Sequence, residues 1–264
     1  MLTTRKAWAF FRRDLLIDLS YKLSFALQVV DLLMGIASFF FLARMIGPGS
    51  YRTYEPFSFI LIGMAVNGYM TTSLACFSQA VRGNQPIGTL KAVLVTPTSP
   101  LGFILLSSSY PFARAAFDAG LYLVAGMMFG LSLGRMNITG MLVLFLLSVL
   151  VFSSIGVLSA TFTLIFKRGD PLLWLFGGLS WLIGGVFYPI EVLPGFLRYA
   201  AQLLPLTHVL QGMRAAILSG ASTRQLLPQI GILALFALFG VPLSLAAFHF
   251  GMRRARSAGT LSHY

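Results

Sequence analysis

The sequence predicts an all-α integral membrane protein, and three observations lead to this fold class. Hydrophobic residues make up 57% of the 264 residues and charged residues only 10%, well below the share that covers a soluble surface. The apolar residues come in long unbroken runs, whereas the strands of a membrane barrel would alternate apolar and polar residues. The single cysteine, Cys76, excludes an internal disulfide. A soluble enzyme, a disordered tail and a disulfide scaffold are therefore excluded.

Six apolar runs are predicted to cross the membrane as helices. A helix needs about 20 apolar residues to cross the hydrocarbon core of a bilayer. The predicted spans are residues 23–42, 57–77, a stretch within 101–133, 141–166, 172–187 and 230–250. We therefore expect a single transmembrane domain over residues 23–264, preceded by a separate segment over residues 1–22.

The segment before the first span is predicted to be an amphipathic helix. Trp8, Phe11, Leu15 and Leu19 recur at helical spacing, and charged residues occupy the other positions of the helical wheel. Such a helix lies in the inner headgroup layer. The alternative is a simple positively charged anchor.

The distribution of basic residues predicts that both termini are cytoplasmic. The net charge is +12, and Lys and Arg concentrate in the cytoplasmic loops of membrane proteins. With both termini inside, most basic residues outside the spans are cytoplasmic. The outer side holds the smaller set of Arg44, Arg52, Arg135, Arg198, Arg214 and Arg224.

Two irregular segments are predicted between the spans. The inner loop 80–100 carries an apolar stripe between Pro86 and Pro97, which predicts a short cytoplasmic helix that docks on a partner. Alternatively, this helix lies back on its own membrane domain. The outer segment 188–228 holds two amphipathic runs that are too short to span, as is typical of re-entrant helices.

Three charged residues fall inside the predicted spans: Asp31, Arg114 and Asp118. Arg114 and Asp118 are four residues apart on one helix, so they share a face and can pair. Charges within the membrane are expensive and mark transport pathways. The residues are therefore either a structural pair or part of a substrate path, and Asp31 can pair with Arg114 or face the pathway.

No motif for catalysis or nucleotide binding is found. A phosphate-binding P-loop needs a Gly-Lys pair, and no Gly-Lys occurs in this chain. The three histidines are scattered, so no metal site is expected. Two other classes remain open on these residues alone. One is a proton-coupled secondary transporter with Asp31 and Asp118 as proton carriers, and the other is a membrane-embedded enzyme or assembly factor without transport.

Two blocks of the chain resemble the type-2 ABC (ABC-2) export permeases. Gly88-Thr89-Leu90-Lys91, followed by Thr96-Pro97, is similar to the cytoplasmic coupling segment of that family, although Lys91 stands where the family usually has glutamate. Phe187-Tyr188-Pro189, Leu193-Pro194 and Leu204-Pro205 are similar to its outer re-entrant segment. The second block is closest to the branch that exports lipo-oligosaccharides and drugs.

The resemblance implies a permease subunit that is not itself an enzyme. It implies a separate ATPase subunit that binds ATP and Mg²⁺, and a location in the inner membrane. It also implies a second permease chain, and in this family the two chains usually form a homodimer. It implies outward transport of an amphiphile such as a lipo-oligosaccharide, glycolipid or drug. No cofactor is expected on this chain, and no nucleic acid.

The resemblance also assigns two sets of site residues. The coupling helix would bind the ATPase through Ile87, Gly88, Thr89, Leu90, Lys91, Val93, Leu94 and Pro97. The substrate path and its outer gate would include Asp31, Arg114, Asp118, Phe187, Tyr188, Pro189 and Phe196.

Overall fold

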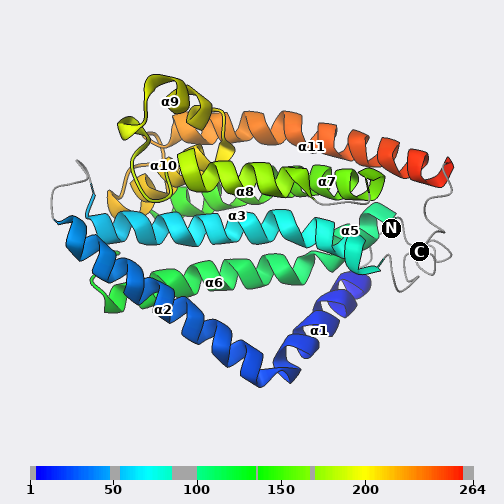
Figure 1. Ribbon diagram of the computed structural model, residues 1–264, viewed down its shortest axis with the longest axis horizontal. Helices are drawn as coiled ribbons and strands as arrows, with labels where there is room; N and C mark the ends of the chain where they lie inside the picture. Colours follow the sequence, from blue (N-terminus) through cyan, green and yellow to red (C-terminus); the bar gives the residue numbers. More distant parts are fainter. Residues whose placement is uncertain (1–3, 48–53, 85–99, 135, 167–169, 258–264) are drawn as a thin grey trace.

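The computed structural model describes residues 4–47, 54–84, 100–134, 136–166 and 170–257. Within these residues every regular element is helical, which confirms the all-α fold class. Figure 1 shows α3, α6, α7 and α11 running roughly along the longest axis of the molecule, while α2 lies oblique to them. Helix α1 begins and α11 ends at one end of the bundle, and α9 and α10 lie at the opposite end.

Helices α1 (Thr4–Ser20) and α2 (Lys22–Ile46) confirm the predicted N-terminal helix and the first span. The backbone leaves helical geometry at Tyr21, with φ −97° and ψ 60°. The two helices therefore form a V with its apex at this residue (Figure 1).

Helix α1 packs on α5 and α6 through only part of the predicted stripe. The ring of Phe10 lies 5.7 Å from that of Phe103, and the ring of Phe11 lies 5.6 Å from that of Tyr110. Trp8 and Leu19, both in the predicted stripe, are exposed. Phe11 therefore packs as predicted, and Phe10 joins it on the buried face because Phe103 offers it an aromatic partner.

The second, fourth and sixth spans are confirmed as α3 (Pro56–Asn84), α7 (Ile138–Phe166) and α11 (Leu227–Ser257). Together with α2 they are the four helices, among the described residues, that are long and apolar enough to cross a membrane. The main core lies between α3, α7, α10 and α11 and includes Met70, Phe152 and Leu233, which are almost fully buried.

The third run forms two helices, α5 (Pro100–Ser107) and α6 (Ser109–Met128). At the junction, the Ser108 hydroxyl donates to the carbonyl of Ile104 at 2.9 Å. This run is longer than a bilayer requires, and the break divides it into a short helix and a helix of 20 residues.

The fifth run forms a helix that is shorter than predicted. Helix α8 (Pro171–Ile183) has 13 residues, or about 20 Å. The Asp170 carboxylate caps its first turn by accepting from the Leu173 amide at 3.0 Å. It ends at Ile183 because Gly185 adopts a left-handed φ of +79° and turns the chain.

The segment predicted to be outer, 188–228, contains the two short helices that the sequence predicts, α9 (Gly195–Gln202) and α10 (Pro205–Leu218), after a 3-10 turn at Ile190–Val192. Most of α10 is buried against α3, α7 and α11, while α9 leaves Phe196 and Tyr199 exposed. Helix α10 is therefore part of the core rather than a helix on the surface of the bundle.

Candidate functional site

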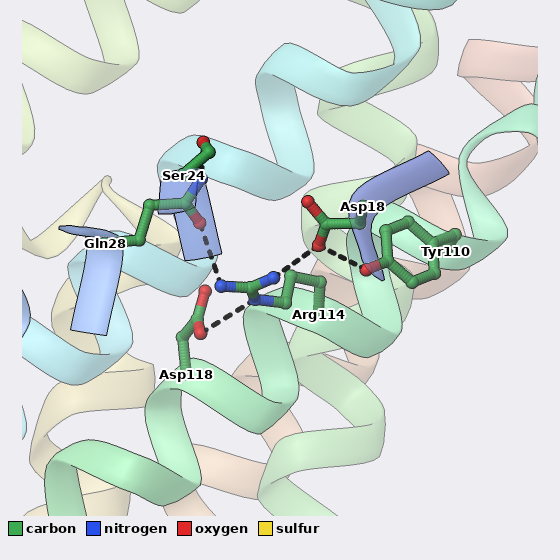
Figure 2. A network of polar contacts seen from close by, with 6 residues as sticks. All are labelled: Asp18, Ser24, Gln28, Tyr110, Arg114 and Asp118. Atoms are coloured by element: carbon green, nitrogen blue, oxygen red, sulfur yellow. Dashed lines mark hydrogen bonds and ion pairs between the residues drawn. The ribbon is translucent and has the colours of Figure 1, made fainter. Parts of the chain in front are cut away.

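A cluster of polar side chains joins three helices around Arg114 of α6 (Figure 2). Its Nε atom lies 3.1 Å from the carboxylate of Asp118, one turn along the same helix. One terminal nitrogen pairs with Asp18 of α1, and the other donates to the side-chain oxygen of Gln28 of α2 at 2.8 Å. The predicted pair of Arg114 and Asp118 is confirmed, and it is part of a larger network.

Asp18, Tyr110 and Gln28 belong to this cluster but were not predicted from the sequence, and Asp18 is the charged residue among them. It accepts from both Arg114 and the hydroxyl of Tyr110. A carboxylate in the last turn of a helix faces the negative end of the helix dipole, so Asp18 needs a positive partner. The signal in the sequence was an acidic residue just before the end of a largely basic helix, but only the fold shows that α6 supplies the partner.

The cluster borders a cavity of about 230 Å³ between α2, α3 and α6. Asp31, Arg114 and Asp118 all line it, so the structure brings together the three charges predicted for a substrate path. Asp31 does not pair with Arg114: within the described residues its carboxylate makes no hydrogen bond or ion pair. The guanidinium of Arg114 is already engaged by the other members of the cluster.

The four residues predicted for the outer gate lie at the opposite end of the bundle but do not form one rim. The ring of Phe187 lies 4.8 Å from Trp181 of α8 and 5.7 Å from Phe39 of α2. The Tyr188 hydroxyl donates to the carbonyl of Leu182. Phe196 is 73% exposed on α9, so it does not join the other aromatic residues.

A second cavity, of about 800 Å³, lies at this end of the bundle, which the sequence predicts to be the outer end. Pro189, the fourth predicted gate residue, lines it together with Glu191, Arg198 and Gln211. Its walls come from the turn after α8, from α9 and α10, and from the first residues of α3 and α11. The segment 188–228 thus borders a space large enough for part of a ligand.

The structure corrects the predicted position of Arg214, which lies on α10. It was expected at the outer surface, but only 4% of it is exposed. Its guanidinium donates to the carbonyls of Gly185, Val186 and Phe59 at 2.8–3.2 Å, and it lies 3.4 Å from the centre of the Phe59 ring. The charge is buried because backbone oxygens surround it.

The residues predicted for the coupling helix lie outside the described residues. They are Ile87, Gly88, Thr89, Leu90, Lys91, Val93, Leu94 and Pro97.

The comparison with known families decides what kind of protein this is. A family model described as "ABC-2 type transporter" matches residues 5–218. The chain belongs to the ABC-2 type transporter family. No curated protein sequence matches it. The matched residues of this ABC-2 permease include α1 to α10. They therefore contain the Arg114 cluster and all walls of the 800 Å³ cavity other than the one from α11.

The Arg114 cluster of the permease gives a first testable prediction. Asp18→Asn removes the charge that joins α1 to α6, where the paired side chains are only 15% and 26% exposed, and should lower the stability by about 1 kcal/mol. The control is Asp14→Asn on the same helix, because Asp14 pairs with Arg13, which is 53% exposed. Thermal unfolding of the purified variants checks this. Equal melting temperatures for the two variants would contradict it.

Proposed function

We propose that the chain is the membrane subunit of an exporter that moves an amphiphile outward across the inner membrane. The observation that carries the proposal is the family match over residues 5–218, because membrane subunits of ABC transporters work with an ATPase. ATP and Mg²⁺ bind to that separate ATPase subunit. Two copies of the permease pair, and an ATPase subunit binds to each on the cytoplasmic side.

In this proposal, closure of the ATPase dimer moves the segment around 87–97, which is continuous in sequence with α3 and α5. The motion reaches the outer end through the long helices α3 and α7, which pack against α10. The turn that contains Phe187, Tyr188 and Pro189 then opens and closes the outer cavity. Phe196, exposed on α9, offers an apolar surface to the departing amphiphile.

Co-purification with the ATPase subunit tests the partner and the coupling segment. Leu90→Glu places a charge in the predicted apolar docking stripe, and burial of an unpaired charge in an interface is costly. We expect the complex to weaken and the transport-coupled ATP turnover to fall by about tenfold, which corresponds to about 1.4 kcal/mol.

Lys91→Glu is the matched control for this experiment. It adds the same carboxylate at the adjacent position, where the family usually has glutamate, so coupling should persist. If Leu90→Glu leaves both complex formation and ATP turnover unchanged, the docking segment is assigned wrongly. Transport by the isolated permease in sealed vesicles, without any ATPase, would contradict the proposed function itself.

A further inference from the structure

We propose that the cavity between α2, α3 and α6 binds the protonated amine of the transported amphiphile, with Asp31 as its counter-ion. The inference rests on the proposed export function and specifies the chemistry of the substrate. The apolar tail of the amphiphile would stay outside the cavity, along α2.

The charges around the cavity favour a cation. Asp31, Asp118 and Arg114 line it, and Arg114 is paired with Asp118 and with Asp18. Asp31 is left without an ion pair among the described residues. A charge within the bilayer without a partner costs at least about 2.5 kcal/mol. An ammonium ion bound beside Asp31 would offset this cost. The site is thus acidic, whereas the protein as a whole carries a net charge of +12.

A second observation, independent of the carboxylates, points to a ligand with N–H groups. Tyr69 lines the same cavity and is only 4% exposed. Its hydroxyl is buried close to the Ser73 side chain, one turn along α3, but forms no well-aligned hydrogen bond with the described residues. A buried polar group without a partner is costly. A protonated amine can donate to both the Asp31 carboxylate and this hydroxyl, whereas a quaternary ammonium has no hydrogen to donate.

The dimensions of the cavity fit a head group. Its volume of about 230 Å³ is below the range of sites that enclose whole ligands. Small residues leave the space open: Ala65, Ala115 and Ala119 line the cavity, and a side chain at Gly68 would meet no atom within 4 Å. A primary amine fits in this space, but the complete amphiphile does not.

The surface next to Asp31 suits an apolar tail. Leu27 and Met34 lie one turn before and after Asp31 on α2, so all three share one helix face. These two side chains are 59% and 66% exposed. A tail along this face would remain in contact with lipid while the amine enters the cavity.

Direct binding of tritiated decylammonium to the full-length permease tests the proposal. The permease is placed in nanodiscs of phosphatidylcholine and phosphatidylglycerol, which carry no primary amine. We expect saturable binding that decyltrimethylammonium and decyl sulfate compete for only weakly. Asp31→Asn should raise the Kd by about tenfold or more, and Tyr69→Phe by a smaller factor. Asp14→Asn, a charge on α1 paired with Arg13, should leave the Kd unchanged.

Three results would overturn the proposal. The first is an equal Kd for decylammonium in Asp31→Asn and in the wild type, when both proteins elute as the native species in size-exclusion chromatography. The second is equally tight binding of decyl sulfate. The third is displacement of the probe by phosphatidylethanolamine in the discs, because the site would then hold a resident lipid and not an exported substrate.

The binding assay needs neither ATP nor the ATPase subunit, so it separates this proposal from the proposed function. Binding that depends on Asp31 without any ATP-coupled export would contradict the exporter assignment and leave the amine site standing. ATP-coupled export without this binding would contradict the amine site alone.

Discussion

Arg214→Met should cause the largest loss of stability of any single substitution considered for this permease. The arginine joins α10 to the start of α3 and to the turn after α8 through four hydrogen bonds to three carbonyls. Methionine fills a similar volume but leaves those buried carbonyls without the donor. A buried acceptor without its partner costs about 1–3 kcal/mol, so we expect a loss of about 3–5 kcal/mol.

Fluorescence-detected size-exclusion chromatography measures both the melting temperature and the yield of monodisperse protein for each variant. For a chain of this size, the expected loss corresponds to a decrease of about 10 °C or more. Arg224→Met is the control, because Arg224 is an exposed arginine at the same end of the molecule. Arg214→Lys should rescue little, because a lysine cannot reproduce the planar fork of donors. A native melting temperature for Arg214→Met would show that the turn after α8 is held by other contacts.

Gly63→Ala should have the next largest effect, at the same junction. A Cβ atom at this position would lie 2.2 Å from the carbonyl oxygen of Val186 and 2.8 Å from a terminal nitrogen of Arg214. The first contact is with backbone, which cannot rotate away as a side chain can, so α3 and the turn must separate. We expect a loss of about 2–3 kcal/mol, in the range for overpacking of a core.

Gly68→Ala on the same helix is the matched control for Gly63→Ala. A Cβ atom at Gly68 would meet nothing within 4 Å, and alanine has the higher helix propensity. Its melting temperature should therefore be equal to or above that of the wild type. If the two variants have the same stability, close approach at Gly63 is not what fixes the turn.

The sequence predicted most of the helices because the membrane imposes simple rules on composition and length. Long apolar runs without charge must form helices in a bilayer, and α2, α3, α7 and α11 follow these runs closely. The N-terminal helix and the two short outer helices also followed from periodicity and from the positions of proline. The prediction was less accurate at α5–α6 and α8, where Ser108 and Gly185 interrupt an apolar run.

The candidate site was only partly predictable. Spacing along one helix was enough to pair Arg114 with Asp118, since residues four apart share a face whatever the rest of the fold does. No such rule relates Asp18 to Arg114, which are separated by 96 positions in the sequence. The same is true of Arg214 and the carbonyl of Phe59.

The sequence by itself determined that this chain is a helical membrane protein, and it supplied the resemblance to the ABC-2 family. Both could be read from the sequence because the length of an apolar run and a local motif are properties of short segments. Only the tertiary structure decided that Asp31 lines a shared cavity without a partner among the residues that the structure describes, and that Arg214 is buried. The environment of a charge depends on which distant helices pack around it. For Asp31 those helices leave an open cavity, and for Arg214 they supply a ring of backbone oxygens.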